Sequence, residues 1–304
     1  MSLIEQQLTF YFSSSPENGA KNISADRNRF SVQLDNPIHI PQAAVKCSLE
    51  VSKALIWNTV PNISAEIGNN TFKVLEGGTS IVPAGDPGNP NRVITIPDGL
   101  YSITELQNYL SKAFANLGKS SDLVKFSQDD ATQKVILTFP YTTTQVDFRD
   151  SESPNNCRTV LGFNNRLVPL DTLQPAGWSE AGDVEAEFNR TNNFVIRTNL
   201  ISNGVPVNNI YGGNICIVPI TAVPGSQIVY QPYIPDKVDA GELINHIKNE
   251  FNFELVDQLG RQVEVGKSEP WSFVCIIKYY VPAPVHDHHK FSSGVPRSMG
   301  AYAG

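Results

Sequence analysis

Short runs of alternating hydrophobic and polar residues, broken by Asn, Gly and Pro, dominate the two ends of the chain. Alternation of this kind places every second side chain on one face, as in a β-strand with one buried face. The pattern predicts four strands before residue 69, at residues 8–12, 30–34, 43–57 and 63–67. It predicts six more after residue 189, at residues 194–200, 215–220, 228–233, 244–256, 262–265 and 271–281.

The middle of the chain carries one clear helix signal. Ser102 and Glu105 have the spacing of a capping box, apolar residues then recur at helical spacing as far as Leu117, and Gly118 can end the helix. Around this helix we expect a short helical segment near 156–161 and five short strands, at 70–75, 93–97, 124–127, 134–139 and 145–148. These elements predict a compact α+β unit.

The number of strands predicts the architecture. About ten strands at the two ends supply the eight of an antiparallel jelly roll, with two to spare. The expected fold is therefore mainly β: a jelly-roll sandwich interrupted by an α+β insertion with one long helix. The alternative, two consecutive jelly rolls, needs about sixteen strands. The expected parts are 1–68, the first part of the jelly roll with an N-terminal arm; 69–165, the inserted α+β domain; 166–281, the second part of the jelly roll; and 282–304, an extended C-terminal arm.

Composition narrows the class of protein. Charged residues make up only 17% of the 304, and Gly and Pro contribute 21 each, which suits a β-rich protein with a largely neutral surface. The net charge of −7 argues against a large basic surface for nucleic acid. No secretory pattern opens the sequence and no apolar run has the ~20 residues of a membrane helix, so we expect a soluble protein made in a cytosol.

The sequence contains none of the common catalytic or nucleotide-binding motifs, and we expect neither an enzyme nor a cofactor. His286, His288 and His289 are weak candidates for metal ligands, because they lie in a Gly- and Pro-containing tail that offers no groups to fix them. Asp129 and Asp130 are adjacent acids that fit a hairpin turn better than acid–base catalysis. We therefore assign no catalytic residue.

Cysteine and tryptophan positions indicate packing rather than chemistry. The four cysteines are too scattered for a disulfide framework, and Cys216 and Cys275 stand in apolar runs typical of a buried thiol. Trp178 lies in a polar stretch, which makes it a candidate for an exposed aromatic site that stacks on a sugar.

The order of six short motifs carries a resemblance. These are Arg27–Leu34, Asn69–Val74, Ile94–Ser102, Leu161–Phe163, Val195–Asn203 and Glu254–Arg261. The match as a whole spans roughly residues 29 to 281. In this order they resemble the capsid proteins of the double-jelly-roll virus lineage, which includes virophages, polinton-like viruses and tailless icosahedral phages. The resemblance is closest to the single-jelly-roll vertex (penton) proteins. The short loops at Gly212-Gly213 and Pro224-Gly225 depart from the hexon-type relatives.

The resemblance implies a structural virion protein, a penton subunit that assembles as a homopentamer in an icosahedral capsid. Its partners would be copies of itself, other capsid proteins and a spike or host receptor, and its location would be the virion, after synthesis in the host cytoplasm or virus factory. One alternative is a major capsid protein whose two jelly rolls form pseudo-hexameric trimers. A second is a receptor- or glycan-binding module of the virion, with an exposed aromatic site around Trp178.

Overall fold

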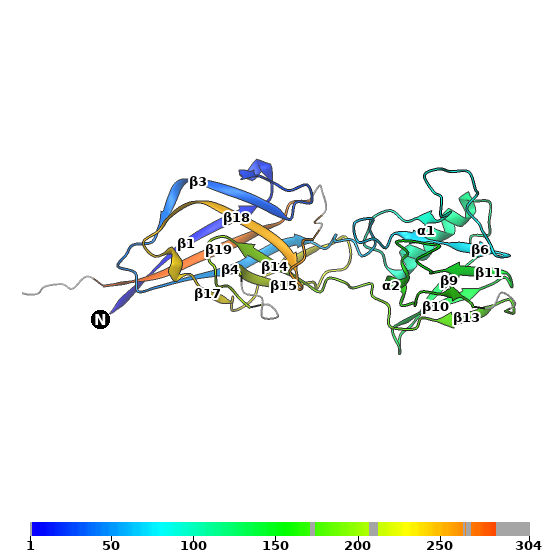
Figure 1. Ribbon diagram of the computed structural model, residues 1–304. Helices are drawn as coiled ribbons and strands as arrows, with labels where there is room; N and C mark the ends of the chain where they lie inside the picture. The colour runs from blue at the N-terminus through cyan, green and yellow to red at the C-terminus, as the bar shows by residue number, and fades with distance from the viewer. Residues whose placement is uncertain (1, 171–173, 207–211, 264, 266–268, 284–304) are drawn as a thin grey trace, which may run out of the picture.

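The structure, a computed structural model, has two lobes arranged end to end (Figure 1). It describes residues 2–170, 174–206, 212–263, 265 and 269–283. A β-sandwich forms one lobe, and a smaller lobe with the longer helix lies beyond a narrow waist. Both the start of β1 and the end of β19 lie at the end of the sandwich that is farthest from the smaller lobe. We call this end of the sandwich the tip.

Two antiparallel sheets form the sandwich, and we call them sheet A and sheet B. Sheet A contains, in spatial order, β1 (Leu3–Ser13), β19 (Ser272–Pro282), β4 (Lys46–Trp57) and β16 (Gln227–Tyr230), with β17 (Lys237–Asp239) also paired to β4. Sheet B contains β15 (Asn214–Pro219), β14 (Asn193–Thr198), β18 (Ile247–Asp257), β3 (Arg29–His39) and β2 (Ala20–Lys21). Two short 3₁₀ helices, η1 (Pro16–Asn18) and η2 (Gly241–Leu243), lie in the connections.

The strand order is that of a jelly roll. Leaving aside the short β2 and β17, eight strands remain, and in chain order the first, eighth, third and sixth form sheet A. The second, seventh, fourth and fifth form sheet B, so the chain crosses repeatedly between the sheets. The interruption falls between the third strand, β4, and the fourth, β14. The expected mainly-β fold is confirmed, with a single jelly roll among the described residues.

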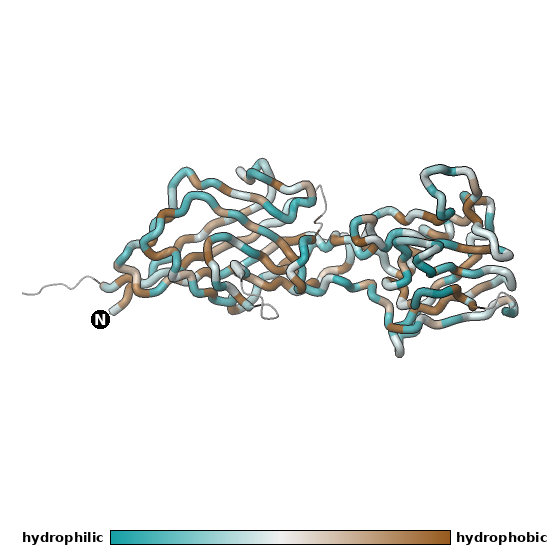
Figure 2. The backbone as a smooth tube through the Cα atoms, viewed as in Figure 1, coloured by the Kyte–Doolittle hydropathy of each residue, from teal (hydrophilic) through white to brown (hydrophobic). Residues whose placement is uncertain are grey.

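Large aromatic side chains fill the space between the two sheets. Phe12 packs on Phe253 at 4.6 Å between ring centroids, and Phe273 meets Phe253 edge-on at 4.9 Å. Trp271 is fully buried, and its indole nitrogen donates to the carbonyl oxygen of Arg27 over 2.7 Å. Hydrophobic residues recur along the sandwich strands, separated by polar ones (Figure 2). The alternation read from the sequence therefore corresponds to one face turned into the core.

The smaller lobe contains the second hydrophobic cluster of the described chain. Three small sheets lie in this lobe. The first contains β13 (Trp178–Ala181), β10 (Lys134–Phe139) and β9 (Lys125–Asp129), and the second contains β12 (Leu167–Val168), β11 (Thr144–Asp147), β6 (Val74–Glu76) and β7 (Thr79–Ser80). The third pairs β5 (Thr71–Phe72) with β8 (Ile94–Thr95). The helices of the lobe are α1 (Ile103–Asn116) and α2 (Arg158–Leu161). These small sheets and the long helix do not form the second jelly roll of the alternative fold.

Helix α1 begins with the predicted capping box. The Ser102 hydroxyl accepts from the backbone nitrogen of Glu105, and the Glu105 carboxylate accepts from the backbone nitrogen of Ser102. The buried residues Leu106, Leu110 and Phe114 then lie on the face that packs into the lobe. Neither helix of the described chain combines the length and apolar character needed to cross a membrane.

Two of the predicted strands are wrong. Residues 63–67 do not form a strand: Ile63 makes only an isolated bridge to Gly99, and residues 65–67 form a turn. Beside this turn the Asn69 side chain accepts from the Ser64 backbone nitrogen and donates to the Asn62 carbonyl. In the range 262–265 the described residues are 262, 263 and 265; they form no strand, and Gln262 makes an isolated bridge to Val256.

The second cluster also draws on a longer segment than the expected 69–165, since it includes Ile63 and has Phe188 packed against it. We propose residues 61–189 as the inserted lobe and use that name for this segment below.

Candidate functional site

The candidate metal ligands lie outside the described residues. His286, His288 and His289 all fall in 284–304, so their arrangement is not part of the structure. Among the residues that are described, no group of three or more His, Cys, Asp or Glu side chains could hold a metal ion.

The four thiols are free and buried. Burial raises the pKa of Cys47 to about 11 and those of Cys157, Cys216 and Cys275 to about 12. A thiol becomes a nucleophile or metal ligand only as the thiolate, which these pKa values disfavour near neutral pH. The cysteines therefore act as small apolar core residues.

The adjacent acids Asp129 and Asp130 lie where β9 turns into β10, as the sequence predicts. The Asp129 carboxylate accepts from the Thr132 hydroxyl over 2.7 Å and from the Ala131 backbone nitrogen over 3.1 Å. These hydrogen bonds lower the pKa of Asp129. Its carboxylate stabilises the turn of the hairpin.

Trp178 does not form an exposed aromatic platform. It begins β13, is half-buried, and packs on Phe139 at 6.1 Å between ring centroids. The sequence misses β13 because Trp178-Ser-Glu-Ala contains little apolar alternation. The sugar-stacking site around Trp178 therefore has no structural support.

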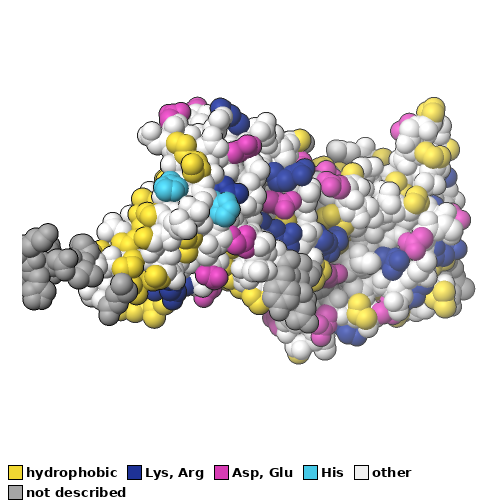
Figure 3. All heavy atoms as spheres, turned by 60° about the vertical axis from the view of Figure 1, so that its left-hand side comes forward, with side chains coloured by type: hydrophobic (Ala, Val, Ile, Leu, Met, Phe, Trp, Pro, Cys, Tyr) yellow, Lys and Arg dark blue, Asp and Glu magenta, His cyan; other side chains and the backbone are white. Residues whose placement is uncertain are grey.

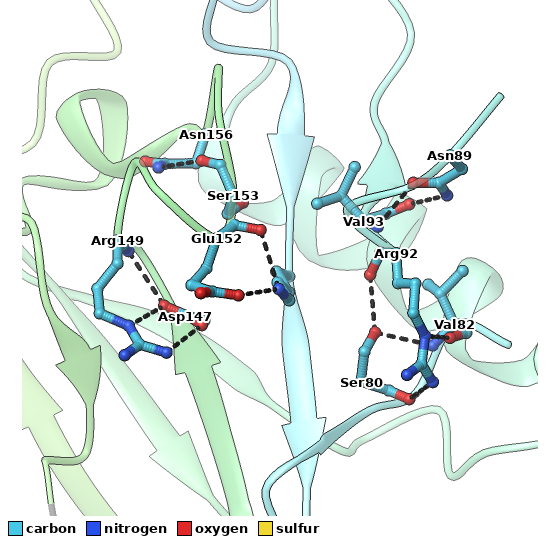
Figure 4. A network of polar contacts seen from close by, with 11 residues as sticks. Ser80, Val82, Asn89, Arg92, Val93, Asp147, Arg149, Glu152, Ser153 and Asn156 are labelled. Carbon is cyan, nitrogen blue, oxygen red and sulfur yellow. Dashed lines mark hydrogen bonds and ion pairs between the residues drawn. The ribbon is translucent and has the colours of Figure 1, made fainter. Parts of the chain in front are cut away.

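Other polar groups in the inserted lobe stabilise its own loops (Figure 4). The Arg92 guanidinium donates to the carbonyls of Val82 and Ser80 over 2.7 and 2.8 Å. Asp147, which is buried, accepts two hydrogen bonds from the Arg149 guanidinium at 2.9 and 2.8 Å and one from the Arg149 backbone nitrogen at 3.1 Å. Because these groups already have protein partners, the network serves folding rather than catalysis.

The described surface has several hollows, of which two have volumes of about 550 and 630 Å³. A groove of about 550 Å³ lies over sheet B, where Arg29, Glu254 and Arg197 follow one another across β3, β18 and β14. A second hollow of about 630 Å³ lies at the waist and is lined by side chains that include Arg158 and Arg261. Those two arginines are paired with Asp150 and Asp257 respectively, and neither hollow brings together an activated nucleophile and a base.

Charge is divided unequally between the lobes. The inserted lobe, residues 61–189, contains 9 Lys and Arg against 16 Asp and Glu, which makes −7, and the rest of the chain contains 14 of each. The whole net charge of the protein thus lies on the inserted lobe. The segments that form the sandwich and the tail are together neutral.

The outer face of sheet A, turned away from the core, combines exposed apolar side chains with a paired charge. Tyr11 is 60% exposed on this face, and Val229 is 59% exposed. Glu50 and Lys278 form an ion pair at 2.6 Å, with side-chain exposures of only 6% and 18%. The sequence pattern alone does not reveal this face, although the alternation in 271–281 places Lys278 on the side opposite Ile277.

Hydrophobic side chains also gather at the tip of the sandwich (Figure 3). Leu3 and Ile4 at the start of β1 are 49% and 40% exposed, and Val45, just before β4, is 60% exposed. The Val45 backbone nitrogen donates to the carbonyl of Tyr280, which places this residue beside the end of β19. Clusters of exposed apolar side chains typically mark sites of interaction with other molecules.

The chain is similar in structure to solved proteins but not in sequence to a known family. No model of a protein family and no curated protein matches the chain. Among solved structures, the chain is similar to the SeMet-labeled mavirus penton protein, with a TM-score of 0.44 and 11% sequence identity. The match covers 92% of this chain and 100% of that one.

Proposed function

We propose that the chain is a structural virion protein, the penton subunit of an icosahedral capsid, and that it assembles as a homopentamer. The observation that carries this proposal is the division of charge: a nearly neutral sandwich with exposed apolar residues is joined to a lobe whose net charge is −7.

Lateral contacts between subunits favour a neutral sandwich. Burying a charge in an interface is costly unless it is paired, and the interface core is depleted of charged residues. On the outer face of sheet A, Glu50 already has a partner in Lys278 within the same subunit. Packing another subunit over this face would therefore bury a preformed ion pair rather than two isolated charges.

The acidic inserted lobe fits a position away from the lateral contacts between subunits. Five lobes of charge −7 repel one another when they pack closely, whereas solvent and salt screen them when they project outward. In this arrangement the sandwiches form the ring through one repeated contact between two different patches. The inserted lobe then faces outward, where it is available to a spike or host receptor.

Light scattering of the purified full chain at several concentrations tests the proposal. Five copies of 33.4 kDa give a particle of 167 kDa, and we expect this mass. A particle of about 100 kDa, three copies of 33.4 kDa, would instead favour the trimeric major-capsid alternative. A monomer at every concentration would contradict self-assembly through the sandwich alone.

A further inference from the structure

The four edges of the sandwich differ in how open they are. On sheet A, the edge opposite β1 is broken into β16 and β17, of four and three residues, with Pro232 and Pro235 between them. On sheet B, β2 has two residues, and β15 has six and ends at Pro219. Short strands and prolines are the usual devices that prevent an edge from pairing with another chain.

β1 lacks these devices. Its eleven residues pair with β19 in one unbroken register, from Leu3 opposite Pro282 to Ser13 opposite Ser272. The strand contains no Pro, Gly or Lys, and its single charged residue is Glu5. Among the described residues no strand pairs with its other side. A long, regular and open edge of this kind is suited to accept a further strand.

Hydrogen bonds at the two ends of β1 show which of its backbone N–H and C=O groups face β19 and which face the open edge. The Ala283 nitrogen donates to the Ser2 carbonyl, and the Ser14 nitrogen donates to the Trp271 carbonyl. Even-numbered residues of β1 therefore direct their backbone groups toward β19. Because these groups alternate along an antiparallel strand, the odd-numbered residues direct theirs toward the open edge. Glu5, Gln7, Thr9 and Tyr11 are the central members of that odd-numbered set.

The core-facing side of β1 is also incompletely covered. Phe12 is 2% exposed, Phe10 and Leu8 are only partly buried, and Ile4 at the tip is 40% exposed. A strand added beside β1 would place its own inward side chains next to this row. Apolar burial would then accompany the new backbone hydrogen bonds.

We propose that residues 285–293 of one copy add as a strand to the open edge of β1 in a neighbouring copy. This rests on the proposed assembly into a ring. The segment belongs to the 21 residues that follow Ala283, where the described chain ends at the tip. Fully extended, 21 residues reach about 70 Å, roughly twice the ~36 Å length of an eleven-residue strand.

The sequence of the tail favours residues 285–293 as the added strand. They form a nine-residue stretch without Pro or Gly, bounded by Pro284 and Gly294. Strand alternation would place His286, His288 and Lys290 on one face. A cationic Lys290 on that face complements Glu5, the lone charge of β1. Donation from each subunit to the next is a head-to-tail contact, which can close into a ring.

The test substitutes one residue on the open edge. Gln7→Pro removes a backbone N–H that faces the open edge and leaves the hydrogen bonds to β19 in place. Gln7→Ala removes the same side chain and keeps the N–H, so it is the matched control. A third variant ends at Ala283. Hydrogen exchange of peptides from β1 and light scattering are measured on all of these and on the full chain.

We expect slow exchange in β1 for the full chain and for Gln7→Ala, and fast exchange for Gln7→Pro and the shortened chain. Loss of one hydrogen bond predicts a dissociation constant raised about tenfold or more in Gln7→Pro. A ring that persists unchanged in Gln7→Pro and in the shortened chain would overturn the strand addition but leave the proposed function standing. A monomer with tail-dependent protection would show that the tail binds its own β1, and a monomer without protection would overturn both proposals.

Discussion

The side-chain amide of Asn62 donates to the backbone carbonyl of Phe188 over 3.0 Å, and so joins the two segments that connect the lobes. The same amide donates to the carbonyl of Tyr101 over 2.7 Å and accepts from the Tyr101 nitrogen over 2.9 Å. Asn62 is 2% exposed. One buried side chain thus joins the first segment of the inserted lobe to its last segment and to the residue just before the N-cap of α1.

Replacing Asn62 by Ala should destabilise the inserted lobe selectively. The substitution leaves buried backbone groups without partners, at a cost of about 1–3 kcal/mol for each unsatisfied group. We expect calorimetry to show an earlier transition for the inserted lobe and an unchanged one for the sandwich. Asn108→Ala, at an exposed position on α1, is the control. Equal shifts of both transitions would mean that the lobes unfold as one unit.

The ion pair on the outer face of sheet A gives a second prediction. In Lys278→Met the Glu50 carboxylate stays buried without its partner, and one of its oxygens, Oε2, already lacks a hydrogen bond. Removal of one member of a buried pair costs about 3–5 kcal/mol, and we expect a loss near 3 kcal/mol because Lys278 is partly exposed. The midpoint of urea unfolding measures this loss.

The double variant Glu50→Gln/Lys278→Met is the control for that measurement. It removes both charges, so it should recover most of the stability lost in Lys278→Met. If the single and double variants unfold at the same urea concentration, the buried carboxylate is not the cause of the loss.

Features set by neighbouring residues could be predicted from the sequence. The capping box of α1 depends on Ser102 and Glu105, three residues apart, and the strand at 134–139 has the predicted bounds. The alternation also separated buried from outer positions in β19, where Phe273, Cys275 and Ile277 enter the core.

Features set by distant residues could not be predicted in the same way. Residues 63–67 have the composition of a strand, but the Ser64 backbone nitrogen donates to the Asn69 side chain, and the residues that follow Ser64 form a turn. The open edge of β1 depends on which strands pair, and β1 and β19 lie at opposite ends of the sequence. Trp178 is covered by Phe139 only after β13 has paired with β10.

The capping box predicts a dependence of stability on pH. Hydrogen bonds from the Ser102 backbone nitrogen and hydroxyl lower the pKa of Glu105 in the folded state. A lowered folded-state pKa means that the stabilisation is fully present above the unfolded pKa of about 4.3 and is lost as the pH falls through the folded value.

We therefore expect Ser102→Ala to lose about 1 kcal/mol near neutral pH and progressively less below pH ~4. Urea unfolding of the wild type and the variant at pH 7 and pH 3 measures the difference. A loss of the same size at both pH values would contradict a contribution from the ionised Glu105.

The inserted lobe should be removable without loss of the sandwich. The two hydrophobic clusters are separate, and the connecting segments have anchors on the sandwich. The Asn58 side chain donates to the Ala222 carbonyl over 2.8 Å, and the Gln258 side chain accepts from the Asn192 nitrogen over 3.1 Å. We expect a chain in which a short Gly-Ser linker replaces residues 61–189 to fold, with a β-type circular dichroism spectrum.

Assembly of this shortened chain tests where the subunit contacts lie. If the sandwiches form the ring, light scattering should show the same number of copies as for the full chain. Weaker repulsion should also reduce the dependence of assembly on salt, because the deleted residues carry the net charge of −7. The matched control replaces only the loop 83–91, which contains one charged residue, Asp86, and leaves the second cluster intact. A folded but monomeric sandwich, with a control that still assembles, would place the contacts on the inserted lobe.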